Sequence, residues 1–172
     1  MRQNYGGNID SWILGRLSRK PWMYWKTRNG RPFANMQYAF NGHMVVLVDA
    51  YTISDGEAFA EGFRRLGLGP LVGTRTWGGG IWLRSNTRLV DGGMARSPET
   101  GMYSPARTWL VEGAGVQPDI VVDNLPHQAF LGKDAQLEAA IAYLKKRIAE
   151  DPPRIPEAPP LPDKAFDYPV GR

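Results

Sequence analysis

The chain has 172 residues, which is enough to bury the core of one domain. Its hydrophobic content of 42% and charged content of 22% are ordinary for a globular protein. It contains no cysteine, which excludes disulfides, thiolate metal sites and cysteine nucleophiles. The apolar stretches are far shorter than a membrane span, and no signal-peptide pattern is recognisable. Neither His43 nor His127 has a partner at metal-ligand spacing, so we expect no metal site.

The net charge of +4 is unevenly distributed along the chain. Residues 1–48 hold seven Lys or Arg residues against Asp10 alone, a balance of +6, and the remainder carries −2. Basic residues among aromatic ones can bind single-stranded nucleic acid or an acidic peptide. The alternative is a solvated basic helix followed by an aromatic packing segment. We favour the second interpretation, because the charge is modest and no nucleic-acid motif is present. The aromatic residues concerned are Trp22, Tyr24, Trp25, Phe33, Tyr38 and Phe40.

The first element expected is a helix that follows a Gly6-Gly7 turn. Asn8 is placed to act as its N-cap, and apolar residues recur at helical spacing up to Leu17. Such a turn normally follows a strand, yet only five residues precede it. We therefore expect a preceding segment that is absent here, which would make this chain the back part of a larger protein.

Residues 45–67 predict a strand, a turn and a helix. Val45 to Val48 form a short β-branched run typical of a buried strand, and Gly67 supplies a helix stop after an apolar stripe. Ser54 stands where the strand passes into the helix, and the sequence Ser-Asp-Gly-Glu that it begins is a capping box. The pattern alone leaves two interpretations open: Ser54 is a helix cap, or it is a nucleophile.

A Gly-rich loop follows the next strand. Leu71-Val72 lead to Gly78-Gly79-Gly80, which lack the lysine and hydroxyl residues of a phosphate-binding loop. We expect these glycines to permit close backbone approach, either to a peptide strand or to the protein itself. Asp91-Gly92-Gly93 predict the turn of a hairpin.

The C-terminal third predicts strands around a second Gly-rich turn, a helix and a tail. Glu112 lies at the turn, where it is either a catalytic carboxylate or a surface glutamate. A helix is expected from about Asp134 with the apolar stripe Leu137, Ala140, Ile141, Leu144 and Ile148. Residues 151–172 hold seven of the fourteen prolines. We expect them to form an extended tail along the surface or to a neighbouring subunit, after a domain of residues 1–150.

Three stretches carry a family resemblance: RQNYGGNIDSWILGRL, VVLVDAYTISDGEAFAEGFRRLGLGPLVGTRTWGGG and WLVEGAGVQPDIVVDN. In that order they resemble the catalytic domain of tricorn-type serine proteases, relatives of the C-terminal processing (tail-specific) peptidases. The resemblance covers most of residues 2–150. It implies an α/β fold, a ClpP/crotonase-like spiral of β-β-α units, here incomplete at the N-terminus.

The resemblance also implies roles for individual residues. Ser54 matches the nucleophile, and Glu112 matches the glutamate of a Ser-His-Ser-Glu tetrad. The N–H groups of Gly6 and Asp55 match an oxyanion hole. The strand near Gly78–Gly80 would pair with the substrate backbone. No cofactor is implied, and an endopeptidase of unfolded chains or oligopeptides that assembles into homo-oligomers is expected.

Two departures from the family pattern concern the general base. Gly79 stands where the processing peptidases carry a lysine. Nothing in residues 1–53 matches the Ser-His segment of the tricorn type, and we assign no such role to His43. The base is therefore expected from the absent N-terminal part of the same protein, and this chain alone is expected to be nearly inactive.

An alternative function follows from the same departures: a peptide-binding or assembly module with a protease-derived fold and no catalysis. We expect neither a nucleic-acid nor a membrane partner. The compartment expected is the cytoplasm, or the periplasm if the full-length protein carries a signal peptide.

Overall fold

Four helices and seven strands follow one another in the part of the chain that the structure describes. The computed structural model describes residues 1–162, without the side chains of Ser85 and Asn86. The expected mixture of helix and strand is confirmed, while the spiral of β-β-α units and the boundary of a separate tail stay predictions. Residues 163–172 of the expected tail lie outside the described residues. The elements are α1 (Asp10–Leu17), β1 (Tyr24–Trp25), β2 (Phe33–Ala34), β3 (Val46–Val48), α2 (Asp55–Arg65), β4 (Leu71–Gly73), β5 (Ile81–Arg88), β6 (Met94–Gly101), β7 (Ile120–Val121), α3 (Pro126–Phe130) and α4 (Ala135–Glu150).

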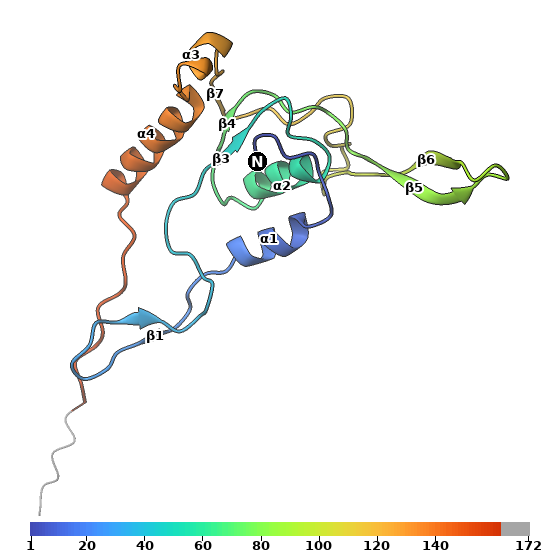
Figure 1. Ribbon diagram of the computed structural model, residues 1–172. Coiled ribbons are helices and arrows are strands. Elements are labelled where there is room, and N and C mark those ends of the chain that lie inside the picture. The colour runs from blue at the N-terminus through green and yellow to red at the C-terminus, as the bar shows by residue number, and fades with distance from the viewer. Residues whose placement is uncertain (163–172) are drawn as a thin grey trace, which may run out of the picture.

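A three-stranded parallel sheet in the order β3-β4-β7 forms the centre of the fold. Figure 1 shows α4 on one side of this sheet and α2, followed by α1, on the other. Parallel strands are buried on both faces, which explains the continuous apolar runs of β3 and β4. Side chains of α1, α2, β3, β4 and the loop before β7 meet in one core: Leu14, Val46, Val48, Phe59, Ala60, Phe63, Leu71, Val111 and Val116.

Helix α2 is the element that fits its sequence prediction most closely. Phe59 and Phe63 are buried one turn apart with ring centroids 6.0 Å from each other. Gly62 lets α1 approach, because a Cβ atom there would lie 2.6 Å from Leu14 Cδ1. The close contact of the two helices places the turn before α1 beside the start of α2.

Two hairpins extend from this body. Strands β5 and β6 pair over eight residues each and project away from the sheet (Figure 1). Their turn at Asp91-Gly92-Gly93 is the expected one. Strands β1 and β2 form the second hairpin, and the proline-rich residues 156–162 line a groove with Tyr24, Trp25 and Pro32.

The aromatic segment does not pack into the core as we expected. Trp22 is 73% exposed and Tyr38 is 72% exposed, since the two-residue strands β1 and β2 provide no sheet to cover them. Arg16 lies 5.0 Å from the ring centroids of both Trp12 and Tyr38, so its guanidinium group stacks at the surface.

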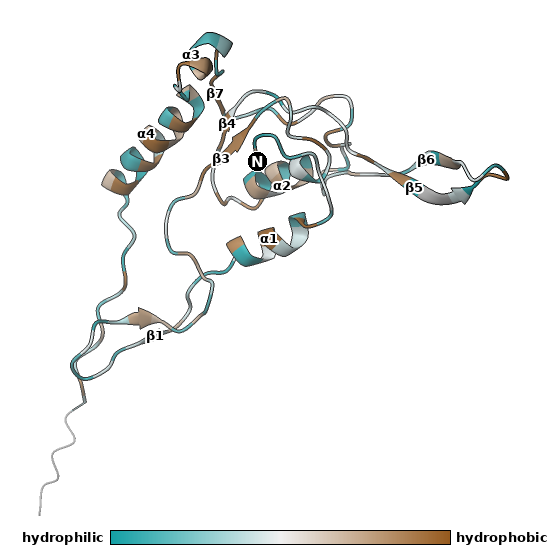
Figure 2. Cartoon of the chain, viewed as in Figure 1, coloured by the Kyte–Doolittle hydropathy of each residue, from teal (hydrophilic) through white to brown (hydrophobic). Residues whose placement is uncertain are grey.

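Other sequence expectations are wrong in detail. Ile9, and not Asn8, is the N-cap of α1, and the segment before Glu112 makes only one isolated bridge, Tyr103 with Trp109. Helix α3 was not anticipated. Helix α4 begins after Asp134 as expected, and its apolar and polar residues alternate in Figure 2. Of its expected apolar stripe, however, only Ala140 is buried.

No helix among residues 1–162 is long and apolar enough to cross a bilayer.

Candidate active site

Ser54 stands between β3 and α2 in a backbone conformation that serine rarely adopts. Its φ is 56° and its ψ is −119°, whereas an ordinary N-cap residue lies in the extended region. Such a conformation costs about 1–3 kcal/mol and is concentrated at functional sites. The Glu57 carboxylate accepts from the Ser54 N–H as in a capping box, and the Glu57 N–H donates to the Ser54 carbonyl at 2.8 Å. The strained turn at a helix N-terminus is typical of an exposed nucleophilic serine.

The Gly6-Gly7 turn packs closely against Ser54. A Cβ atom on Gly6 would lie 2.8 Å from Ser54 Cβ and 3.2 Å from Ser54 Oγ, so only glycine fits. The Gly6 N–H donates to Asn4 Oδ1 at 2.9 Å. The amide expected as an oxyanion donor therefore lies beside Ser54 but already holds an acceptor.

Asp55 joins the two helices that meet at the site. Its Oδ2 accepts from the N–H groups of Ile9 at 2.9 Å and Asp10 at 3.3 Å, so a side chain of α2 caps α1. Asp55 is 3% exposed, and its Oδ1 is buried without a partner. Burial raises the pKa of the Asp55 carboxyl, and the nearby Asp10 raises it further. The Asp55 N–H donates none of the hydrogen bonds found among residues 1–162.

Glu57 is the buried acidic residue of the site. It is 0% exposed, and its carboxylate accepts from four groups. Oε1 takes the Thr76 hydroxyl and the Gly78 N–H, the latter at 2.7 Å. Oε2 takes the N–H groups of Gly79 at 2.9 Å and Ser54 at 3.0 Å. One carboxylate thus fastens the Ser54 turn to the Gly-rich loop.

Glu112 lies on a separate turn and contacts the other end of the Gly-rich loop, at Gly80. It is exposed, and its Oε2 accepts from the Gly80 N–H at 2.8 Å. The Gly113 N–H donates to the Gly78 carbonyl at 2.9 Å, which joins the two glycine-rich segments. Ser54 and Glu112 are therefore linked through the Glu57 carboxylate and the backbone of the Gly-rich loop, although no hydrogen bond joins their two side chains. The N–H groups of Gly78, Gly79 and Gly80 are all used within the protein.

His43 lies at the opposite end of β3 from Ser54. Its Nε2 is 2.6 Å from the Asp151 carbonyl, at the end of α4. Ser54 follows the carboxyl end of the strand, whereas His43 precedes its amino end. His127 is exposed on α3. The side chain of His43 is therefore held at the end of α4 and not beside Ser54.

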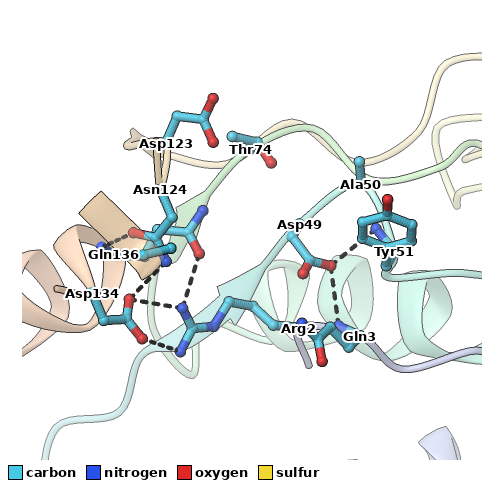
Figure 3. Close-up of a pocket in the computed structure, with 11 residues that line it drawn as sticks. Arg2, Gln3, Asp49, Ala50, Tyr51, Thr74, Asp123, Asn124, Asp134 and Gln136 are labelled. Atoms are coloured by element: carbon cyan, nitrogen blue, oxygen red, sulfur yellow. Dashed lines mark hydrogen bonds and ion pairs between the residues drawn. The ribbon is translucent and has the colours of Figure 1, made fainter. Parts of the chain in front are cut away.

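A polar cavity lies at the carboxyl ends of the three parallel strands. Its volume is about 570 Å³, and Asp49, Thr74 and Asp123 line it (Figure 3). Arg2 spans it and pairs with Asp134 through two bonds of 2.8 and 2.7 Å. This ion pair holds the segment before Gly6 against the start of α4, and so helps to fix the position of the Gly6-Gly7 turn beside Ser54.

Comparison with known proteins decides the family. Residues 1–122 match the family model of peptidase family S41. The chain belongs to peptidase family S41. It is 35% identical over 160 residues to the tricorn protease homolog 1 of Streptomyces coelicolor, and 33% identical over 159 residues to the tricorn protease of Thermoplasma acidophilum. These alignments cover 93% and 92% of this chain and 15% of each relative, so the chain spans about a seventh of their length.

Solved structures agree with that assignment. A crystal structure of the tricorn protease matches 87% of this S41 chain with a TM-score of 0.80 and 34% identity, over 15% of its own length. A putative peptidase from Parabacteroides merdae has the same fold, with a TM-score of 0.64 and 21% identity over 86% of this chain and 51% of its own. The resemblance seen in the sequence motifs is confirmed.

Sequence reasoning missed two polar residues of the site, Asn4 and Thr76, and saw in Glu57 only a helix cap. The sequence signal for Glu57 was its capping-box position, which explains one of its four bonds. The other three partners lie 19 to 22 residues away, beyond any local pattern.

Proposed function

We propose that this chain is the part of a serine peptidase that carries the nucleophile, and that Ser54 attacks the scissile carbonyl to form an acyl-enzyme. Membership of peptidase family S41 supports the reaction class. The single observation that carries the residue assignment is the backbone of Ser54. Its φ of 56° differs from that of a simple cap, and a strained nucleophile turn explains it.

The oxyanion is held by the Asp55 N–H and one amide of the Gly6-Gly7 turn. Asp55 lies at the N-terminus of α2, where unpaired N–H groups and the helix dipole favour negative charge. The Gly6 N–H can donate to the oxyanion once the Asn4 side chain moves away from it. The alternative donor is the Gly7 N–H, which donates no hydrogen bond among residues 1–162. Each such donor contributes about 10²–10³ in rate.

Glu112 orients a general-base histidine supplied by another segment of the same protein. Among residues 1–162 its exposed carboxylate accepts a hydrogen bond from the Gly80 N–H alone, which leaves its remaining lone pairs accessible. A serine without its base is a weak nucleophile, so this chain by itself is nearly inactive. A peptide or unfolded chain is the substrate. It extends along the strand that begins at Ile81, since the N–H groups of Gly78–Gly80 are used internally. The active form is a homo-oligomer in the cytoplasm.

The test is peptidase activity of the full-length protein with Ser54→Ala against the matched control Ser18→Ala. Ser18 is an exposed residue at the end of α1. We expect Ser54→Ala to lower kcat at least about 10³-fold, and Ser18→Ala to leave it within twofold. Retained activity in Ser54→Ala would refute the assignment. Tight peptide binding with no cleavage by the wild-type protein would favour a non-catalytic peptide-binding module instead.

A further inference from the structure

The Glu57 carboxylate collects more donors than a capping box needs. A capping-box glutamate accepts one N–H, that of the N-cap residue, here Ser54. Glu57 also accepts from the N–H groups of Gly78 and Gly79 and from the Thr76 hydroxyl. A fully buried carboxylate is costly unless such bonds satisfy it, so a merely structural cap at this position would not need to be an acid.

The hydrogen bonds of Glu57 hold two segments, the Ser54 turn and the Gly-rich loop. The bond from the Ser54 N–H holds that residue in its strained conformation. The bonds from Gly78 and Gly79 hold the Gly-rich loop, whose next N–H reaches Glu112. The two proposed catalytic side chains therefore share one buried support.

Thr76 extends this support toward the turn that carries Glu112. Its Oγ1 donates to Glu57 and accepts from the Val116 N–H at 2.7 Å. Thr76 is 0% exposed, and Val116 is 2% exposed. Because the hydroxyl is both donor and acceptor, a methyl group in its place would leave a carboxylate oxygen and an amide short of a partner.

We propose that Glu57 is a positioning residue for the peptidase reaction. It fixes the backbone of Ser54 and the Gly-rich loop and touches no substrate. This inference rests on the proposed function of Ser54. It predicts a loss in the rate of acylation with little change in substrate affinity, because the misplaced group is the nucleophile.

Glu57→Gln in the full-length protein tests the proposal, with Glu61→Gln as its matched control. Both glutamates are buried on α2, but Glu61 pairs with Arg64 and Arg65, away from Ser54. The measurement is modification of Ser54 by a fluorophosphonate probe over a range of probe concentrations, below the unfolding temperature of each variant. We expect Glu57→Gln to lower the saturating rate about 10²-fold while the half-saturating concentration stays within threefold. Glu61→Gln is expected to leave both values within twofold.

Thr76 provides a second pair of variants that does not depend on the folding of Glu57→Gln. Thr76→Val is expected to lower the saturating rate at least tenfold, and Thr76→Ser, which restores the hydroxyl, to return it to within threefold of wild type. A threonine that served only packing would show the opposite order, since valine matches its shape.

The possible outcomes distinguish failure of the positioning role of Glu57 from failure of the proposed function of Ser54. If the probe does not modify Ser54 in the wild-type protein, the proposed function fails and this inference fails with it. If Ser54 is modified in the wild-type protein and folded Glu57→Gln reacts within threefold of it, the positioning role alone is overturned. Equal rates for Thr76→Val and Thr76→Ser would overturn it in the same way.

Discussion

Gly6→Ala probes the close approach on which the site depends. The Gly6 φ is +102°, a region that costs an alanine about 1–2 kcal/mol. The new Cβ would also lie 2.8 Å from Ser54 Cβ and 3.3 Å from the Ile53 carbonyl oxygen, closer than van der Waals contact. Overpacking of this kind costs about 1–3 kcal/mol. We therefore expect a loss of about 2–5 kcal/mol in the free energy of unfolding, and slower modification of Ser54.

Substitutions at two other glycines distinguish the cost of backbone strain from the cost of a steric clash in the same assay. Gly67 also has a positive φ, +67°, but a Cβ there meets nothing within 4 Å, so Gly67→Ala should lose only about 1–2 kcal/mol. Gly15 lies in α1 with open space around its Cβ position, so Gly15→Ala should gain about 0.5–1 kcal/mol.

Urea unfolding followed by circular dichroism gives the three values on one scale. The expected order, from most to least stable, is Gly15→Ala, wild type, Gly67→Ala, Gly6→Ala. If Gly6→Ala were as stable as Gly67→Ala, the contact between the glycine turn and Ser54 would be refuted. If Gly6→Ala were destabilised but Ser54 reacted at the wild-type rate, the turn would support the fold and not the site.

Three further substitutions test the supports around the site. Asp134→Asn should lower stability by about 1–2 kcal/mol at pH 7, because Arg2 holds the pKa of Asp134 below its usual value. A depressed carboxyl pKa stabilises the fold above about pH 4 and less as the pH falls, so the loss should shrink in acid unfolding curves; a constant loss would contradict the ion pair. Phe63→Ala should cost about 3–5 kcal/mol in thermal unfolding, since Phe63 is 1% exposed, and a loss under about 1 kcal/mol would contradict the core assignment. Gly80→Ala, whose Cβ would lie 2.9 Å from Val111 Cβ, should lower both stability and peptidase activity of the full-length protein, and unchanged activity would separate that loop from the site.

The parts of the fold that follow from local pattern were predictable. An apolar run predicted strand β3, an apolar stripe at helical spacing predicted helix α2, and a second apolar run predicted strand β4. Glycines between these segments marked where the elements end. Asp134 was expected at the start of the last helix, and its carboxylate accepts the Leu137 N–H at 3.0 Å. Each of these signals lies within one turn or one strand, so no knowledge of distant partners was needed.

The remaining features depend on distant partners and could not be read locally. Asn8 offered an N-cap for α1, but Asp55, 46 residues from Ile9, supplies the acceptor instead. Glu57 shows the same limit, since its position predicted one bond and the fold provides three more. The order of motifs suggested the family, and only the folded chain shows how one buried carboxylate connects them.

Asp55→Asn addresses the one buried polar atom without a partner among the described residues. Asp55 Oδ1 accepts nothing, and burial and the nearby Asp10 carboxyl raise the pKa of Asp55. The asparagine carbonyl can replace Oδ2 as the acceptor for Ile9 and Asp10, while its amide removes the buried charge and can donate toward the Asp10 carboxylate. An unsatisfied buried group costs about 1–3 kcal/mol, so we expect Asp55→Asn to be more stable by about 1 kcal/mol at pH 7.

The difference in stability between Asp55→Asn and wild type should depend on pH. A raised carboxyl pKa in the folded state means that the wild type gains stability as the pH falls through that pKa, because the folded state binds the proton more tightly. The advantage of Asp55→Asn should therefore diminish in parallel unfolding curves as the pH falls toward the ordinary aspartate pKa of about 4. An asparagine variant less stable than wild type at pH 7 would show that the negative charge of Asp55, and not only its acceptor oxygen, holds the start of α1. The protein would then keep an unfavourable buried charge because α1 and the glycine turn beside Ser54 depend on it.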